Sequence, residues 1–157
     1  TNGLASLQGS GFVATADGLV LPVAELVPPG FAVTVYADGQ ALPGRVLKRG
    51  AAENLALLKV EATGLRTAGF AGELRPGEQV VLRGKVADQG EVFLVVNQGI
   101  VRSVAPGVFG TTIAESAVLK GAPLYTGEGR IAGIALVAGD GTVRAVPASS
   151  LRSFLGL

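Results

Sequence analysis

Glycine and proline constrain this chain more than any other feature, because they interrupt its sequence at short intervals. The 157 residues include 24 glycines and 8 prolines. The segments between them are short, apolar and rich in Val and Ile, which is typical of β-strands rather than helices. Asp-Gly pairs at Asp17-Gly18 and Asp38-Gly39 separate such segments and indicate tight hairpin turns. The sequence therefore predicts an all-β protein of short antiparallel strands.

The spacing of these segments divides the chain into two halves and a C-terminal tail. The periodicity is weak over residues 62–76, which indicates a connector between two sets of strands. After Pro147 apolar residues recur at helical spacing, so the chain is expected to end in a short helix. We predict a single domain with a first barrel over 1–68, a second barrel over 69–146 and a helix over 147–157.

The charge pattern argues against nucleic acid as a partner. The chain has thirteen Lys and Arg residues and twelve Asp and Glu residues, which gives a formal net charge of +1. The chain has no basic tract, and only 5% of its residues are aromatic. A nucleic-acid surface usually needs both a cluster of cations and stacking side chains.

Cysteine and histidine are both absent. The first absence rules out disulfides and thiolate metal sites, and the second removes the commonest general base and metal ligand. No acidic loop of the calcium-binding type occurs either. We therefore expect no metal ion and no cofactor.

The mean hydropathy of the chain is high, at +0.49. Its most apolar stretch, residues 19–35, is nevertheless interrupted by Glu25 and by Pro22, Pro28 and Pro29. A transmembrane helix needs about 20 apolar residues in a row, so no transmembrane segment is predicted. We predict no signal peptide at Thr1 and expect the chain to be part of a larger protein.

Six short motifs follow one another along the chain: Gly9-Ser10-Gly11-Phe12-Val13, Asp17-Gly18-Leu19-Val20-Leu21, Glu53-Asn54-Leu55-Ala56-Leu57-Leu58-Lys59-Val60, Arg75-Pro76-Gly77-Glu78-Gln79-Val80, Gly99-Ile100-Val101-Arg102-Ser103, and Gly121-Ala122-Pro123-Leu124 with Gly129-Arg130-Ile131-Ala132-Gly133-Ile134. In this order and spacing they resemble the high-temperature-requirement (HtrA/Deg) branch of the trypsin-like serine proteases. The resemblance implies two packed antiparallel six-stranded β-barrels with an active site in the cleft between them.

The same resemblance assigns the three catalytic positions of the family to residues of other chemical types. The histidine position, four residues after the strand that ends at Leu21, is Glu25. The aspartate position, directly before Leu55, is Asn54, and the serine position is Lys120. Hydrolysis needs a hydroxyl nucleophile, a base that works near neutral pH and a buried anion that orients the base. All three are missing, so we expect a pseudoenzyme with no catalytic residues.

By the same resemblance, the residues at the positions of the family's oxyanion loop also differ from the family pattern. The glycine two residues before the serine position is Val118, the next residue is Leu119, and Ala122 replaces the second glycine after that position. A β-branched residue such as Val disfavours the positive φ that an oxyanion loop often needs. If Leu119 and Lys120 fill the cleft instead, the fold would serve as a spacer or docking surface.

In the fold that the resemblance implies, Glu25 and Lys120 face each other across the cleft. Their charges are opposite, so we predict an ion pair or a water-bridged pair between them. If exposed, such a pair contributes about 0–1 kcal/mol.

The resulting functional prediction is a non-catalytic HtrA/Deg-like pseudoprotease domain that acts in protein binding, scaffolding or regulation. Its partner would be a protein or peptide, since trypsin-like folds hold extended peptides along a strand edge. By family habit it would lie outside the cytoplasm, in the periplasm or cell envelope. One alternative is an active hydrolase that uses Ser116 with Lys120 as a dyad. Another is an unrelated β-barrel binding module.

Overall fold

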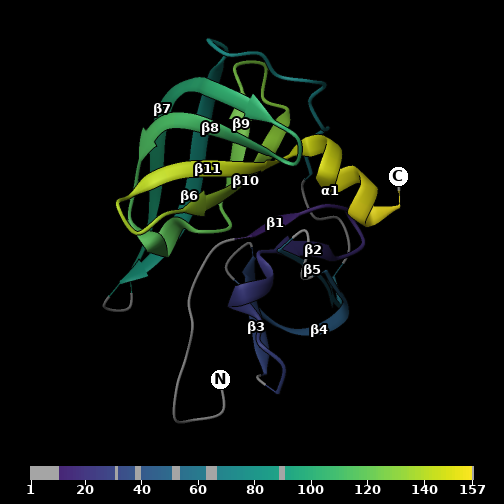
Figure 1. Ribbon diagram of the computed structural model, residues 1–157. Helices are drawn as coiled ribbons and strands as arrows, with labels where there is room; N and C mark the ends of the chain where they lie inside the picture. Colours follow the sequence, from purple (N-terminus) through teal and green to yellow (C-terminus); the bar gives the residue numbers. More distant parts are fainter. Residues whose placement is uncertain are drawn as a thin grey trace.

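The computed structural model describes residues 11–30, 32–37, 40–50, 54–62, 67–88 and 91–156. Strands dominate these ranges, with two short 3-10 turns and one α-helix (Figure 1). In chain order the elements are β1 (Gly11–Val13), β2 (Leu19–Pro22), η1 (Ala24–Leu26), β3 (Val33–Ala37), β4 (Gln40–Gly50), β5 (Leu55–Val60), β6 (Gln79–Asp88), β7 (Glu91–Ala105), β8 (Val108–Ala114), η2 (Ala117–Leu119), β9 (Pro123–Thr126), β10 (Ile131–Val137), β11 (Thr142–Pro147) and α1 (Ala148–Leu155).

The first half of the chain forms a five-stranded antiparallel sheet in the order β1-β2-β5-β4-β3. Strands β2 and β5 lie at its centre and carry its most deeply buried side chains. One face encloses a small apolar cluster, made by Val20, Val27, Ala56, Leu58 and Val60. Burial of this face is what fixes the register, because a shift by one residue would expose these side chains.

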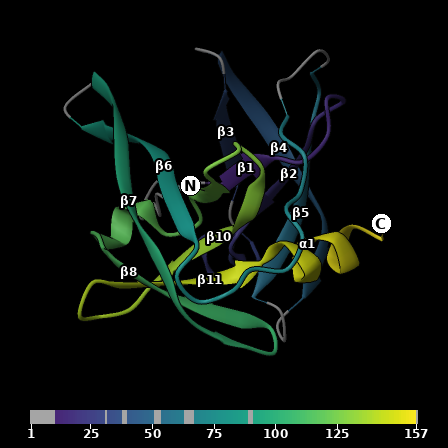
Figure 2. The ribbon, with the colours of Figure 1, turned by 90° about the horizontal axis from the view of Figure 1, so that it is seen from above.

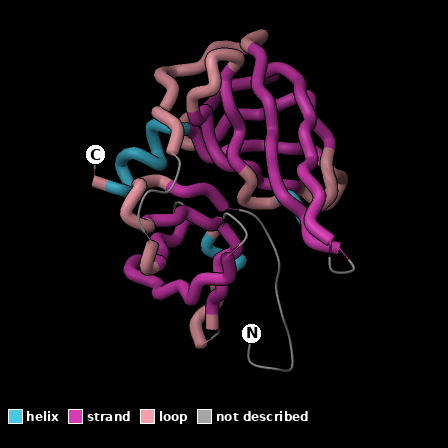
Figure 3. Tube along the Cα trace, turned by 180° about the vertical axis from the view of Figure 1, so that it is seen from behind, coloured by secondary structure: helices cyan, strands magenta, loops and turns pink. Residues whose placement is uncertain are grey.

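The second half closes into a barrel with the strand order β10-β11-β8-β7-β6-β9. Its interior holds the largest buried cluster, to which all six strands and η2 contribute: Val80, Leu82, Val101, Phe109, Ile113, Leu119, Ala122, Leu124, Ala132, Ala135, Val143 and Ala145. The barrel lies above the first sheet in the orientation of Figure 1, and the tube in Figure 3 shows the two halves from behind.

The Asp17-Gly18 turn lies where the sequence predicts a turn, between β1 and β2. Gly18 has a φ of +108°, and the Leu19 carbonyl accepts from the Ala14 N–H at 2.7 Å. The hydroxyl of Thr15 donates to the carboxylate of Asp17, and this hydrogen bond lowers the pKa of that carboxyl. The turn is thus held by both backbone and side-chain bonds.

A third apolar cluster joins the two halves. The first sheet supplies Phe12, Leu21, Val23 and Leu55, the barrel supplies Ile131, Ile134 and Val146, and helix α1 supplies Leu151 and Phe154. Helix α1 buries residues three apart on one face and ends at Gly156, whose φ is +81°. The predicted C-terminal helix is confirmed, and its role is to pack against both halves.

The fold class predicted from the sequence is confirmed, with one difference in detail. The second half is a closed six-stranded barrel, whereas the first half is a half-barrel of five strands within the described residues. The predicted turn at Asp38-Gly39 lies outside the described residues, as do Gly9, Ser10 and Glu53 of the recognised motifs. In the described ranges no helix is both long and apolar enough to cross a membrane.

Candidate functional site

The two 3-10 turns bring together residues from opposite halves of the molecule. Turn η1 follows β2 in the first sheet and carries Glu25, whereas η2 follows β8 in the barrel and ends directly before Lys120. The Lys120 Nζ lies 3.3 Å from the Glu25 Oε2. The Lys120 side chain is 23% exposed and the Glu25 side chain 49%. The ion pair predicted from the sequence is therefore confirmed, and it spans the two halves near the surface.

Asn54 lies beside η1, and the contact between them is a backbone hydrogen bond. Its carbonyl accepts from the Ala24 N–H at 3.0 Å, and the next residue, Leu55, forms a β-bridge with Val23. Asn54 has a φ of +57°, which no other described residue except glycine shares in sign. Asn tolerates this left-handed conformation better than most residues. In the described part of the chain, no hydrogen bond joins the Asn54 side chain to Glu25 or Lys120.

The backbone N–H groups of Val118, Leu119 and Lys120 all donate within η2 and its caps. The Leu119 N–H donates to the Ser116 carbonyl at 3.0 Å, and the Lys120 N–H donates to the Ala117 carbonyl at 3.1 Å. The Val118 N–H donates to the Ser116 Oγ at 3.4 Å. An oxyanion hole needs N–H groups that are free and aimed at one point. The groups nearest Lys120 do not meet that requirement in this conformation.

Leu119 explains why η2 adopts this shape. Its side chain is fully buried and belongs to the barrel core, whereas Val118 beside it is exposed. Burying a leucine side chain contributes about 1.5–3 kcal/mol, which favours the conformation that turns Leu119 inward. The loop is anchored further by Glu115, whose carboxylate accepts from the Ser116 N–H and from the Asn97 side chain.

Ser116 has a role that the sequence interpretation missed. It caps η2, with its Oγ accepting the N–H of Val118. The signal was available, since a serine directly before a short apolar run is typical of an N-cap. Among the described residues, no hydrogen bond connects Ser116 to the Lys120 ammonium, which instead pairs with Glu25. The geometry offers no support for the Ser116–Lys120 dyad considered above.

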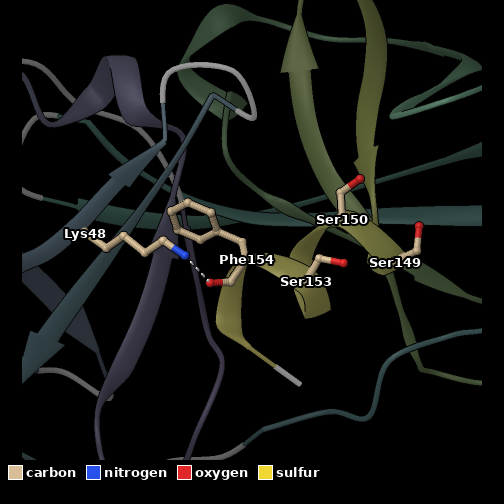
Figure 4. Close-up of a pocket in the computed structure, with 5 residues that line it drawn as sticks. All are labelled: Lys48, Ser149, Ser150, Ser153 and Phe154. Carbon is tan, nitrogen blue, oxygen red and sulfur yellow. Dashed lines mark hydrogen bonds between the residues drawn. The ribbon is translucent and has the colours of Figure 1, made fainter.

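A shallow pocket of about 280 Å³ lies elsewhere, between β4 and α1 (Figure 4). It is lined by Lys48, Phe154 and three serines of the helix, Ser149, Ser150 and Ser153. The Lys48 Nζ donates to the Phe154 carbonyl at 2.9 Å and lies 4.2 Å from the centre of the Phe154 ring. This cation is thus already engaged in fastening the helix to the first sheet. In the part of the chain that the structure describes, no cluster of three acidic side chains could hold a metal ion.

The Glu25–Lys120 pair is expected to contribute little to stability. Because both side chains are partly exposed, a double-mutant cycle with Glu25→Gln and Lys120→Met should give a coupling energy of about 1 kcal/mol or less. The coupling should fall further at high salt. Urea unfolding of the four proteins measures it. A coupling of several kcal/mol would show that the pair is far less solvated than its exposure indicates.

Comparisons with known proteins bear on the whole of this architecture. Residues 9–134 match the family model described as the trypsin-like peptidase domain. The chain is 29% identical over 165 residues to serine protease HTRA1 of Xenopus laevis, covering 94% of this chain and 35% of that protein. The crystal structure of the serine endoprotease from Yersinia pestis superimposes with a TM-score of 0.84 at 20% identity, covering 94% of this chain and 56% of that one. The chain thus spans about a third of the first protein and about half of the second.

Proposed function

This chain belongs to the trypsin-like peptidase domain family and has its HtrA-type fold, and from that premise we propose that it is a non-catalytic member. Its role in this proposal is protein binding, scaffolding or regulation. Glu25, Asn54 and Lys120 would occupy the positions of the histidine, the aspartate and the serine. The proposal concerns this domain and its own residues.

The ion pair between Glu25 and Lys120 is the observation that carries the proposal. It joins the two halves at 3.3 Å, where the family would place a base against a hydroxyl nucleophile. The Lys120 side chain carries no hydroxyl, and its amine contacts the carboxylate of Glu25 instead of facing an open site. The ion pair therefore supports a structural role for Glu25 and Lys120 at this place in the fold.

The conformation of η2 gives separate support. Even with a nucleophile present, the charge that develops on the attacked carbonyl oxygen would need free N–H donors. The N–H groups of Val118 and Lys120 donate within the turn instead. Losing one such donor costs about 10²–10³ in rate in enzymes of this chemistry. The ion pair and the conformation of η2 are thus two separate observations that support the proposed absence of hydrolysis.

The binding role is supported by what the fold retains. Within the described residues the first sheet ends in the edge strands β1 and β3, on which an extended peptide could form main-chain hydrogen bonds. A peptide array probed with the chain tests this role. Reproducible binding to extended apolar sequences that unlabelled chain competes away is the expected result.

The absence of hydrolysis is tested with a fluorophosphonate probe and with denatured casein as substrate. We expect no covalent labelling and no cleavage above the background of buffer, while trypsin in parallel is labelled and active. The physical reason is the missing hydroxyl nucleophile at Lys120. Intact-mass measurement after incubation detects any adduct directly.

Two variants make the outcome decisive. Labelling of the parent chain that disappears in Ser116→Ala would establish the Ser116-based hydrolase in place of our proposal. Labelling that survives in both Ser116→Ala and Lys120→Ala would assign the activity to another serine, and this also would overturn the proposal. Ser153→Ala is a matched control, because Ser153 lies on helix α1 away from the ion pair.

A further inference from the structure

Strands β6 and β7 form a hairpin that extends beyond the barrel. Strand β9 pairs with β6 only over Val80–Leu82, and β8 pairs with β7 only over Val101–Ala105. The distal part of the hairpin therefore consists of two strands that pair with each other, within the described residues (Figures 1 and 2). A two-stranded ribbon is marginally stable in water, so this part of the molecule would gain from a neighbour.

The direction of the backbone groups identifies an edge along β7 that no other strand of the described residues covers. Val101 exchanges hydrogen bonds with Gly77 and Glu78 on the β6 side, and the register between the two strands is continuous. Ile100, one residue earlier, donates its N–H to the Thr112 Oγ1 on the opposite side. By the alternation of an antiparallel ladder, the N–H and C=O groups of every second residue before Ile100 face away from β6. These residues include Val92, Leu94 and Val96.

This edge lacks the features that normally protect exposed strands. Natural sheets guard their edges with lysine, proline or a bulge. The segment Glu91–Val96 contains five consecutive apolar residues, no proline and no cation, and its pairing with β6 shows no register shift. Val92, Leu94 and Val96 are all more than half exposed. The outer edge of β6, in contrast, carries Arg83 and Lys85, which are exposed and charged.

We infer that this edge of β7 pairs with the same edge of a second copy of the chain. In an antiparallel two-fold arrangement, Leu94 lies opposite Leu94 of the other copy, and Val92 lies opposite Val96. The three residues whose backbone groups are open then bond only to one another. The result is a four-stranded sheet in the order β6-β7-β7-β6.

A second copy fits this edge because the pairing is self-complementary. On the face of β7 that carries Val92, Leu94 and Val96, every contact between the two copies joins apolar side chains. On the opposite face, Phe93 of one copy lies opposite Val95 of the other. Glu91 falls opposite Asn97, whose amide already donates to the Glu115 carboxylate at 2.8 Å, so acidic groups lie at the two ends of the contact and not at its centre. The cations Arg83 and Lys85 lie one strand away from the contact. The interface is small, so the dimer is expected to be reversible and to form at high protein concentration.

Sedimentation equilibrium over a concentration series into the millimolar range measures the association. We expect the parent chain to dimerise and Leu94→Glu to weaken dimerisation roughly tenfold or more, since like charges then meet at the two-fold axis. Within one copy the new carboxylate lies beside Lys85, its cross-strand neighbour, so the fold is preserved. Val104→Glu is the matched control. Val104 is 52% exposed against 54% for Leu94, but it lies in the part of β7 that β8 covers.

Complementary charges test the register itself. Leu94→Lys alone should also dimerise poorly, whereas an equimolar mixture of Leu94→Lys and Leu94→Glu should form a heterodimer. Leu94→Pro provides a further variant, because it removes an N–H that faces away from β6 and leaves the hairpin bonds in place. Each variant is checked for folding by circular dichroism.

Each outcome of these experiments either supports or overturns the inferred β7–β7 dimer. A parent chain that remains monomeric throughout the series overturns the inference, as does a dimer that Leu94→Glu and Leu94→Pro leave unchanged. Open-ended filaments would also contradict it, because a two-fold pairing closes on itself. Dimerisation that is lost in the single variants and restored in the mixed pair supports it. None of these results depends on whether the domain hydrolyses peptides.

Discussion

Replacing Gly18 with alanine is expected to lower the free energy of unfolding by about 3 kcal/mol or more. A Cβ built at this position lies 2.1 Å from the Val60 carbonyl oxygen, a backbone atom that cannot move alone. Gly18 also has a φ of +108°, which L side chains rarely adopt. The collision would push apart the turn before β2 and the end of β5, where the Val60 N–H donates to the Gly18 carbonyl at 2.9 Å.

Gly107→Ala is the matched control for this experiment. Gly107 has a φ of +76°, but a Cβ there meets no atom within 4 Å. Its substitution therefore measures the conformational cost alone, which is about 1 kcal/mol. Urea unfolding of both variants gives the difference. Equal losses of stability in the two variants would mean that the close approach of Val60 is relieved by a small movement of the strands.

Leu151→Ala should destabilise the chain by about 2–5 kcal/mol, because it leaves a cavity in the cluster that joins the two halves. Leu151 is fully buried there, together with Leu21 and Leu55 of the first sheet and Ile134 of the barrel. The loss should weaken the coupling between the halves as well as the total stability. Thermal unfolding followed by calorimetry and by circular dichroism measures both.

The control for the helix is Ser153→Ala, which changes an exposed position of the same helix, directly before Phe154. Its effect should stay within about 0.5 kcal/mol. We expect a broader or two-step transition for Leu151→Ala and a single sharp one for the control. A variant at Leu151 that unfolds as sharply and at the same temperature as the parent would show that the helix is not needed to hold the halves together.

Much of the fold could be predicted from the sequence because its signals are local. Asp17-Gly18 indicated a turn, and the turn is there. Apolar residues at helical spacing after Pro147 indicated a helix, which runs from Ala148 to Leu155. The number of strands in the first half was harder to predict, since a sixth strand implied by family resemblance lies nowhere among the described residues.

The candidate site was predictable in its chemistry but not in its conformation. The opposite charges of Glu25 and Lys120 follow directly from the sequence, and the family resemblance predicted that the two residues lie close together. The hydrogen bonds inside η2 depend on Leu119 turning into the barrel core, which is a tertiary effect. No local signal distinguishes a leucine that fills a cleft from one that packs inward. The assignment of these residues to the catalytic positions of the family stays a prediction.

The exposure of the β6–β7 hairpin was also beyond sequence reasoning. Five consecutive apolar residues from Val92 to Val96 show no alternation, and such a run normally indicates a strand buried on both faces. The structure instead leaves most of them exposed at the tip of the hairpin. Periodicity reports how a strand would be buried, and it carries no information on whether another strand or layer reaches it.

The position of helix α1 in the chain has a consequence for biosynthesis. Phe12, Leu21 and Leu55 emerge from the ribosome early, yet their apolar neighbours include Leu151 and Phe154, which are translated about a hundred residues later. At typical elongation rates this interval lasts roughly 5–20 s. During that time the early sheet has one apolar face without its helix, so we expect the nascent chain to be most prone to aggregation at this stage.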